Sequence, residues 1–173
     1  MLPKISLVLG GAASGKSAYA ENLVLSMGLA PIYIATAQSF DDEMTAKIAA
    51  HQEARDAKWH TIEEPIDLPA VLAQRSSDQA VLIDCATLWL SNLLLGAHDL
   101  DARCADLVTA LQNCDAPVAV VSNEVGQGVV PDNALARRFR NAQGRLNQQI
   151  ASIADRVVVV MAGLPMTLKD QSQ

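Results

Sequence analysis

The sequence predicts an α/β protein, with one mostly parallel sheet flanked by helices in a single domain. Short apolar runs recur along the chain with helical stretches between them, which is typical of this class. The run Val118–Val121 is apolar at every position, as expected for a strand that is buried on both faces. A chain of 173 residues, half of them hydrophobic, is long enough to bury the core of one domain.

Each predicted strand is an apolar run, and the predicted helices occupy the stretches between these runs. Strands are expected at Ile5–Leu9, Pro31–Ala35, Ala80–Asp84, Val118–Ser122 and Arg156–Met161. Helices are expected at Gly15–Met27, Asp41–Ala57, Leu68–Arg75, Thr87–Leu95, Asp101–Asn113 and Asn133–Ala154. The segment from Trp59 to Pro65 is expected to be extended or a loop, because proline disfavours helix at the residue before it. The polar residues 169–173 are expected to form a disordered tail.

The composition argues against nucleic acid and membranes as partners. The net charge is −6 and the chain has only two each of Phe, Trp and Tyr, whereas nucleic-acid binders usually show a basic face and often stacking aromatics. No apolar run reaches the ~18 residues of a membrane helix, and no signal peptide precedes the first strand. Cys85, Cys104 and Cys114 lack C-x-x-C spacing, which predicts reduced thiols in a cytoplasmic protein.

Residues 10–17 carry the most informative motif, the pattern G-x-x-x-x-G-K-[ST] of a phosphate-binding loop, or P-loop. Gly10, Gly15, Lys16 and Ser17 occupy its fixed positions, and a predicted strand and a predicted helix flank it, as the motif requires. Glycines let backbone N–H groups turn toward phosphates, and the helix N-terminus adds partial positive charge. Lys16 is predicted to reach the β- and γ-phosphates, and the Ser17 hydroxyl to ligate Mg²⁺.

Residues that end the strands are further candidates, because ligands of such sheets bind beyond the C-terminal strand ends. Asp84 ends a buried strand and is predicted to hold Mg²⁺ or its water shell, although an Asp there can also cap the next helix. The small residues Ala35 and Ala37 leave room for a ligand. Thr36 between them offers a hydroxyl, which by itself is a weak signal.

His51 lies between two cations, Lys47 and Arg55, on one face of the predicted helix Asp41–Ala57. Neighbouring positive charge favours the neutral imidazole, which is the nucleophilic form. The two cations could hold phosphate oxygens, so the face suits attack by His51 on phosphorus. The residues alone leave a solvated face with an incidental histidine equally open. No second His or Cys lies at ligand spacing, so a metal site is disfavoured.

Three other features carry weaker signals. Glu63 or Glu64 could bind a ribose hydroxyl or a base N–H, but both also suit an ordinary surface. The segment Ser122–Pro131 follows a strand and contains two glycines, an Asn and a Glu, which favours a functional loop. The next helix carries four arginines, for which a solvated face is the first expectation: Arg137, Arg138, Arg140 and Arg145.

Taken together, these motifs resemble the family of bifunctional adenosylcobinamide kinase / adenosylcobinamide-phosphate guanylyltransferases of cobalamin synthesis. The resemblance runs from Leu7 to Lys169. A P-loop alone is shared by many families, so the later blocks carry the specificity. These are Tyr33–Ala37, Asp42–Met44, His51, Arg55, Trp59, Thr61, Glu63, Pro65, Asp84-Cys85, Leu88, Asn92, Ser122–Pro131, Ala136–Arg140, Gly144–Gln148, Ala154-Asp155 and Ala162–Pro165.

The resemblance implies two reactions and a RecA-like sheet. A nucleoside triphosphate, ATP or GTP, phosphorylates the aminopropanol hydroxyl of adenosylcobinamide. GTP then gives GMP to that phosphate through a covalent GMP-histidine, which maps to His51, and pyrophosphate leaves. The resemblance also implies a homo-oligomer, a trimer. By motif position, the implied nucleotide contacts are Gly10, Gly11, Ala12, Ala13, Ser14, Gly15, Lys16, Ser17, Ala35, Thr36, Ala37, Gln52, Glu53, Ala54, Arg55, Glu63 and Asp84.

One departure and two alternatives accompany this interpretation. The family usually has Arg where this chain has Ala13, a loss that could alter nucleotide affinity. A P-loop small-molecule kinase without guanylyl transfer would explain the loop and Asp84 but would leave His51 without a task. A non-enzymatic nucleotide-dependent regulatory module would explain the loop alone.

Overall fold

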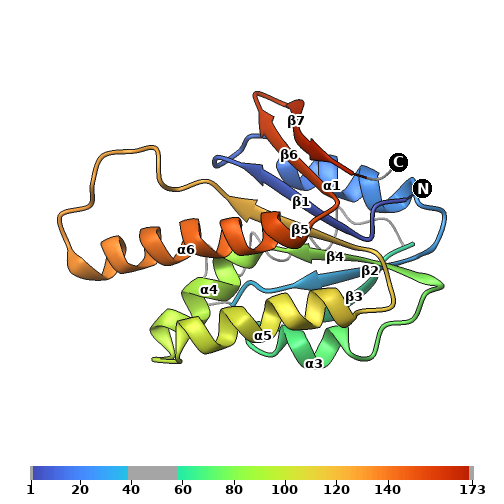
Figure 1. Ribbon diagram of the computed structural model, residues 1–173, viewed down its shortest axis with the longest axis horizontal. Coiled ribbons are helices and arrows are strands. Elements are labelled where there is room, and N and C mark those ends of the chain that lie inside the picture. Colours follow the sequence, from blue (N-terminus) through green and yellow to red (C-terminus); the bar gives the residue numbers. More distant parts are fainter. Residues whose placement is uncertain (1, 39–57, 172–173) are drawn as a thin grey trace.

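The computed structural model describes residues 2–38 and 58–171, which form one α/β domain around a seven-stranded sheet (Figure 1). The strand order is β3-β2-β4-β5-β1-β6-β7. All neighbours are parallel except β6 and β7, which form an antiparallel hairpin. The strands are β1 Ile5–Gly10, β2 Ala30–Ala35, β3 His60–Glu63, β4 Gln79–Asp84, β5 Val118–Asn123, β6 Arg156–Met161 and β7 Leu164–Asp170.

The helices that the structure describes lie on both faces of the sheet. One face carries α1 (Lys16–Leu25), and the other carries α3 (Leu68–Leu72), α4 (Ala86–Leu95), α5 (Leu100–Asn113) and α6 (Ala134–Ile153) (Figure 1). Each face therefore has its own apolar cluster, and the buried Trp89 of α4 belongs to the larger one. Among the described residues, no helix combines the length and the apolar character needed to cross a bilayer.

Strand side chains alternate between these two clusters, as the pleat requires. Val118 and Val120 of β5 pack toward α4, α5 and α6, whereas Ala119 and Val121 pack toward α1. In β4, Val81 and Ile83 follow the first pattern, and Ala80 and Leu82 the second. This alternation fixes which face each strand-end residue occupies.

The structure confirms the fold class, and within the described residues it confirms strands and helices in the regions where the sequence predicts them. The helix α3 ends at Leu72, earlier than the expected Arg75. The expected helix Asp41–Ala57 lies outside the described residues. The segment from Trp59 to Pro65 contains a short strand, β3, which pairs with β2.

The prediction of a disordered tail from residue 169 is wrong for Lys169 and Asp170, which belong to β7. Both pair with β6, and the Asp170 carboxylate accepts a hydrogen bond from Arg156 Nη2 at 3.0 Å. Lys169 Nζ donates to the carbonyls of Ala151 and Ser152 at the end of α6, at 3.1 and 3.2 Å. These partners are distant in sequence, so the polar composition of the tail could not indicate them.

Candidate functional site

The P-loop connects β1 to α1 at the C-terminal edge of the sheet. Its backbone passes through the left-handed region at Ala13, with φ of 54°, and at Gly15, with φ of 91°. Glycine reaches that region without strain, whereas alanine does so at a cost of roughly 1 kcal/mol. Gly15 then serves as the N-cap of α1, so the first free N–H groups of the helix face the loop.

Lys16, the first residue of α1, lies along the loop with only 9% of its surface exposed. Its Nζ donates to the Gly11 carbonyl at 3.0 Å, which holds the ammonium group over the loop. Within the described residues, the buried Ser14 hydroxyl has no hydrogen-bond partner. An ammonium group and an unsatisfied hydroxyl thus lie in the same loop. The ammonium group can pair with phosphate oxygens, whereas the hydroxyl packs against Gly10 and would have to turn outward to do so.

The turn between β6 and β7 supports the P-loop from the side. This two-residue turn has positive φ at both Ala162 and Gly163, 51° and 77°. The Gly163 N–H donates to the Ser14 carbonyl at 2.8 Å. The packing is close: a Cβ built on Gly15 would lie 3.2 Å from Gly163 Cα, and one on Gly10 would lie 2.7 Å from the Val160 carbonyl oxygen. The loop shape therefore depends on a hairpin that is far away in sequence.

Asp84 ends β4 half-buried, on the α1 face by the alternation of β4. The Tyr33 hydroxyl donates to Asp84 Oδ2 at 2.6 Å, and the Tyr33 ring packs edge-to-face against Trp59 with centroids 5.6 Å apart. Burial, followed by the charge of Asp84, raises the pKa of the neighbouring Cys85 thiol to about 11, while Lys16 lowers it. Both Asp84 and Lys16 therefore act on the same small region at the sheet edge.

Thr36 is buried, and all of its polar groups are hydrogen-bonded. Its hydroxyl donates to the Cys85 carbonyl and accepts from the Cys85 N–H, both at 2.8 Å. The Thr36 N–H donates to the Asp84 carbonyl at 3.2 Å, and its own carbonyl accepts from Asn92 Nδ2 at 2.8 Å. The hydroxyl that the sequence offered to a ligand instead ties β2 to the end of β4.

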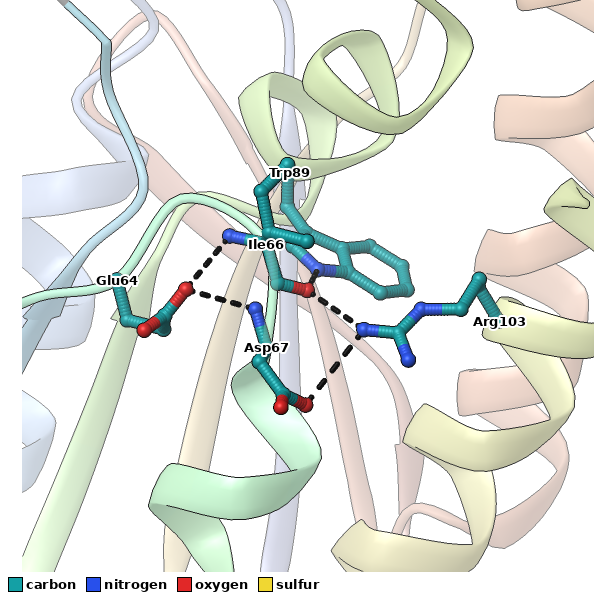
Figure 2. A network of polar contacts seen from close by, with 5 residues as sticks. All are labelled: Glu64, Ile66, Asp67, Trp89 and Arg103. Atoms are coloured by element: carbon teal, nitrogen blue, oxygen red, sulfur yellow. Dashed lines mark hydrogen bonds and ion pairs between the residues drawn. The ribbon is translucent and has the colours of Figure 1, made fainter. Parts of the chain in front are cut away.

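Glu63 ends β3 and Glu64 follows it, and the two side chains have different environments. Glu63 is exposed at the end of β3 and pairs in register with Ala35. Glu64 is half-buried, and its Oε1 accepts the N–H groups of Ile66 and Asp67 at 2.9 and 2.7 Å (Figure 2). The Glu64 carboxylate is therefore committed to the turn that follows β3.

That turn is anchored from the helices behind it. Figure 2 shows the Ile66 carbonyl between two donors, Trp89 Nε1 at 2.8 Å and Arg103 Nη2 at 3.0 Å. Arg103 also pairs with the Asp67 carboxylate at 3.5 Å. Hydrogen bonds from α4 and α5 therefore fix the backbone immediately after Glu63. The sequence contained no local sign of this network.

The loop after β5 is held by two of the arginines on α6. Arg137 Nη1 donates to the carbonyls of Pro131 and Asp132 at 2.9 and 2.7 Å. Arg140 Nη2 donates to the carbonyls of Gly126 and Gly128. Arg137 is exposed and Arg140 half-buried, so both lie at the surface as expected, and they also hold the long loop where it folds back over the start of the helix. Sequence spacing within a helix cannot predict such a return.

Other sequence-predicted residues lie outside the described part of the chain. These are His51, Gln52, Glu53, Ala54 and Arg55. Among the residues that the structure does describe, no three His, Cys, Asp or Glu side chains form a metal-binding group. The described edge therefore brings together the P-loop, Asp84 and Ala35–Ala37, with Glu63 one strand further on.

A glycine loop between a parallel strand and a helix, with a buried lysine and an aspartate beside it at the sheet edge, defines a P-loop nucleotide-binding protein. Residues 6–168 match the family model of cobinamide kinase / cobinamide phosphate guanyltransferase. The chain belongs to this family and is a bifunctional kinase and guanylyltransferase. This membership confirms the resemblance and overturns the two alternatives, a kinase without guanylyl transfer and a non-enzymatic module.

Relatives match over nearly their full length. The chain is 46% identical to the bifunctional adenosylcobalamin biosynthesis protein CobP of Pseudomonas aeruginosa, covering 95% of this chain and 97% of that protein. It is 42% identical to the corresponding CobU protein of Salmonella typhimurium, covering 94% and 98%. Among solved structures, the P4 protein of bacteriophage phi6 in complex with ADP has a TM-score of 0.50 at 16% identity, covering 95% of this chain and 54% of that one. That likeness concerns the fold alone.

Proposed function

We propose that the described sheet edge binds GTP or ATP with Mg²⁺ and serves both reactions of the family. In the first, the hydroxyl of the aminopropanol arm of adenosylcobinamide takes the γ-phosphoryl group. In the second, GMP from GTP is joined to the new phosphate, giving adenosylcobinamide-GDP and pyrophosphate. The observation that carries this proposal is the buried Lys16 ammonium, held over the P-loop by the Gly11 carbonyl on the same sheet edge as Asp84.

The P-loop is proposed to hold the triphosphate, through residues 10–17. Backbone N–H groups at the start of α1 and the Ser14 hydroxyl would donate to phosphate oxygens. Lys16 would exchange the Gly11 carbonyl for a β- or γ-phosphate oxygen, since an ammonium group pairs better with an anion than with a neutral carbonyl. The positive charge would neutralise negative charge that develops on the leaving oxygen.

Ser17 and Asp84 are proposed to hold Mg²⁺. Oxygen donors suit this ion, which keeps several waters and takes its remaining ligands from carboxylates and substrate phosphates. The donor set fits: Asp84 Oδ2 is fixed by Tyr33, whereas Oδ1 makes no hydrogen bond within the described residues. When bound, the ion would neutralise phosphate charge. Tyr33 orients the carboxylate by donating to one of its oxygens.

The nucleoside is proposed to lie beyond the ends of β2 and β3. Ala35 and Ala37 leave space there, and Glu63 would accept hydrogen bonds from a guanine N–H or a ribose hydroxyl. Thr36 would act by position, because Cys85 occupies its hydroxyl. The family resemblance adds Gln52, Glu53, Ala54 and Arg55.

His51 is proposed as the nucleophile of guanylyl transfer. An imidazole nitrogen would attack the α-phosphorus of GTP, forming an N–P bond while the bond to pyrophosphate breaks. A phosphate oxygen of adenosylcobinamide phosphate would then attack the same phosphorus and release the imidazole. Dividing the transfer in this way requires a group that is both a good nucleophile and a good leaving group. The support for this step is the motif position of His51 and its cationic sequence neighbours, Lys47 and Arg55.

The covalent step is tested by incubating the protein with Mg²⁺ and α-labelled GTP and measuring acid-labile, base-stable label on the protein. His51→Ala should lose the label while GTP binding, measured separately, stays within about twofold. Lys16→Ala should weaken GTP binding about tenfold or more, as expected when a charged hydrogen bond is removed. His98→Ala, at an exposed turn, is the matched control and should label normally. Label that persists in His51→Ala would place the nucleophile elsewhere.

We also propose that the chain assembles as a homotrimer in the cytoplasm. The edge strand β7 exposes Leu164, Met166 and Leu168, and the adjacent Met161 is exposed as well, so this edge offers apolar surface to another copy. The cytoplasmic location is supported by Cys85, Cys104 and Cys114, which are all free and buried.

A further inference from the structure

Asn123, the last residue of β5, has a tightly held backbone and an unused side chain. Its N–H donates to Thr87 Oγ1 of α4 at 2.7 Å, and its carbonyl accepts from Asn147 Nδ2 of α6 at 3.2 Å. Its side chain is half-buried and makes no hydrogen bond within the part of the chain that the structure describes. Helices on one side of the sheet thus fix the residue while leaving its amide available.

The groups that hold Asn123 form a buried polar network. Asn147 Oδ1 accepts from the Ser122 hydroxyl at 2.6 Å and from Gln143 Nε2 at 3.0 Å, and Gln143 Nε2 also donates to Ser122 Oγ at 2.7 Å. Ser122 and Gln143 are fully buried. Burying polar side chains is unfavourable unless they are paired, and apolar residues would fill the same space. Within the described residues every bond named here is made, while Gln143 Oε1 has no partner, and the network fixes the backbone at the end of β5 through Asn147.

That position lies directly beside the P-loop. Asn123 pairs in register with Gly10, and the N–H of Glu124 donates to the Gly10 carbonyl at 3.1 Å. Ala119 and Val121 face α1, and Ser122 faces α6, so strand alternation places the Asn123 side chain on the α1 face. Asp84 occupies the same face of the adjacent strand β4, where it pairs in register with Val121. Asn123 consequently lies on the same face as Asp84 and next to the strand that enters the P-loop.

We infer that the Asn123 amide donates a hydrogen bond to the terminal phosphoryl group of the bound nucleoside triphosphate. This role rests on the proposed function, because it needs the triphosphate in the P-loop. The contact would distinguish triphosphates from diphosphates. It would also stabilise charge on the phosphoryl oxygens during transfer to the cobinamide hydroxyl, since the donor is carried on backbone that is already held in place. No bond to Asn123 forms or breaks: the phosphoryl group passes from the nucleotide to the hydroxyl oxygen.

The test compares Asn123→Ala and the isosteric Asn123→Asp with the wild type. Dissociation constants are measured with two probes, the β,γ-imido analogue of GTP and GDP, each with Mg²⁺. Phosphorylation of adenosylcobinamide and the melting temperature are measured on the same proteins. Asn113→Ala, an exposed asparagine at the end of α5, is the control and should match the wild type throughout.

Asn123→Ala should bind the imido analogue about tenfold more weakly while GDP affinity stays within twofold, as for loss of one charge-assisted hydrogen bond. Its kcat for phosphorylation should fall about 100-fold, the effect of removing one fixed donor. Asn123→Asp should lose at least as much affinity for the imido analogue and as much kcat, because the charge of the new carboxylate repels phosphate. The melting temperature should stay within about 2 °C for Asn123→Ala, since its amide contacts no described polar group.

Two outcomes would assign Asn123 a structural role and overturn the inference. One is an equal loss of affinity for both nucleotides; the other is a lowered melting temperature with an unchanged preference for the triphosphate. Unchanged binding and kcat would overturn it as well. Nucleotide binding by Lys16→Ala shows whether only the inference about Asn123 fails or the proposed function fails as well. If Lys16→Ala binds both nucleotides normally, the P-loop assignment itself is wrong; if it does not, only the role of Asn123 fails.

Discussion

Thr36 shows how a single buried hydroxyl can tie the end of one strand to the end of its neighbour. It makes both of its hydrogen bonds with Cys85, the residue that follows Asp84. We expect Thr36→Val to lower the free energy of unfolding by about 2–3 kcal/mol, because it leaves the buried Cys85 N–H unpaired at nearly constant volume, whereas the Cys85 carbonyl keeps its hydrogen bond from Trp89 N–H. Thr36→Ser keeps the hydroxyl and loses one methyl group, so its loss should be about 1 kcal/mol. Urea unfolding measures both, and equal losses would contradict the assigned role.

At the residue scale, the sequence could predict those site residues whose spacing is local. Gly10, Gly15, Lys16 and Ser17 form one continuous motif, and their chemistry is written in their order. Asn123 could not be assigned a role in this way. The role that we infer for it rests on its register with Gly10 and on hydrogen bonds to α4 and α6, which are properties of the folded sheet.

At the scale of the element, the glycines of the P-loop differ in how much space surrounds them. A Cβ on Gly10 would lie 2.3 Å from Ser14 Oγ and 2.7 Å from the Val160 backbone oxygen, whereas one on Gly11 would have no atom within 4 Å. We expect Gly10→Ala to lower the free energy of unfolding by about 1–3 kcal/mol, because backbone must move. Gly11→Ala should stay within about 0.5 kcal/mol of the wild type. Urea unfolding without nucleotide tests this, and equal effects would contradict the packing.

The elements that the sequence did not predict as strands are the two edge strands of the sheet, β3 and β7. β3 has only four residues and is exposed along most of its length, so it lacks the apolar run that identified the inner strands. β7 contains Pro165, which is unusual in a strand and tolerated at an edge, and its side chains are almost all exposed. Burial on both faces is what made β1, β4 and β5 predictable from composition.

At the scale of the whole molecule, the sheet order determines which distant segments meet at the site. β5 lies between β4 and β1, so Asn123 is placed between the strand that carries Asp84 and the strand that enters the P-loop. Crossovers of this kind are not encoded in any local pattern, although the parallel character of the sheet predicted that all strand ends would share one edge. The sequence therefore predicted which edge of the sheet carries the site, whereas only the strand order shows which residues lie next to the P-loop.

The buried thiols give the molecule a predictable sensitivity to alkaline pH. Burial, with a smaller contribution from Asp84 and Asp101 respectively, raises the pKa of Cys85 and of Cys104 from 9.0 to about 11. Between these values the unfolded chain loses thiol protons that the folded chain keeps. The folded state is then the more protonated one, so stability is fully present below pH 9 and declines as the pH rises toward 11.

Each of these two thiols should reduce the free energy of unfolding by about 1.4 kcal/mol per pH unit in this window, or roughly 3 kcal/mol per unit together. Urea unfolding of the wild type between pH 8 and pH 11 measures the slope. Other groups also contribute to the slope in this pH range. The informative quantity is therefore the difference in slope between the wild type and Cys104→Ala or Cys85→Ala, because those other groups are the same in all three proteins. Each variant should show a slope shallower by about 1.4 kcal/mol per unit, whatever its stability at pH 8. Parallel slopes would mean that the thiols ionise equally in the folded and unfolded chains, which their burial between sheet and helices opposes.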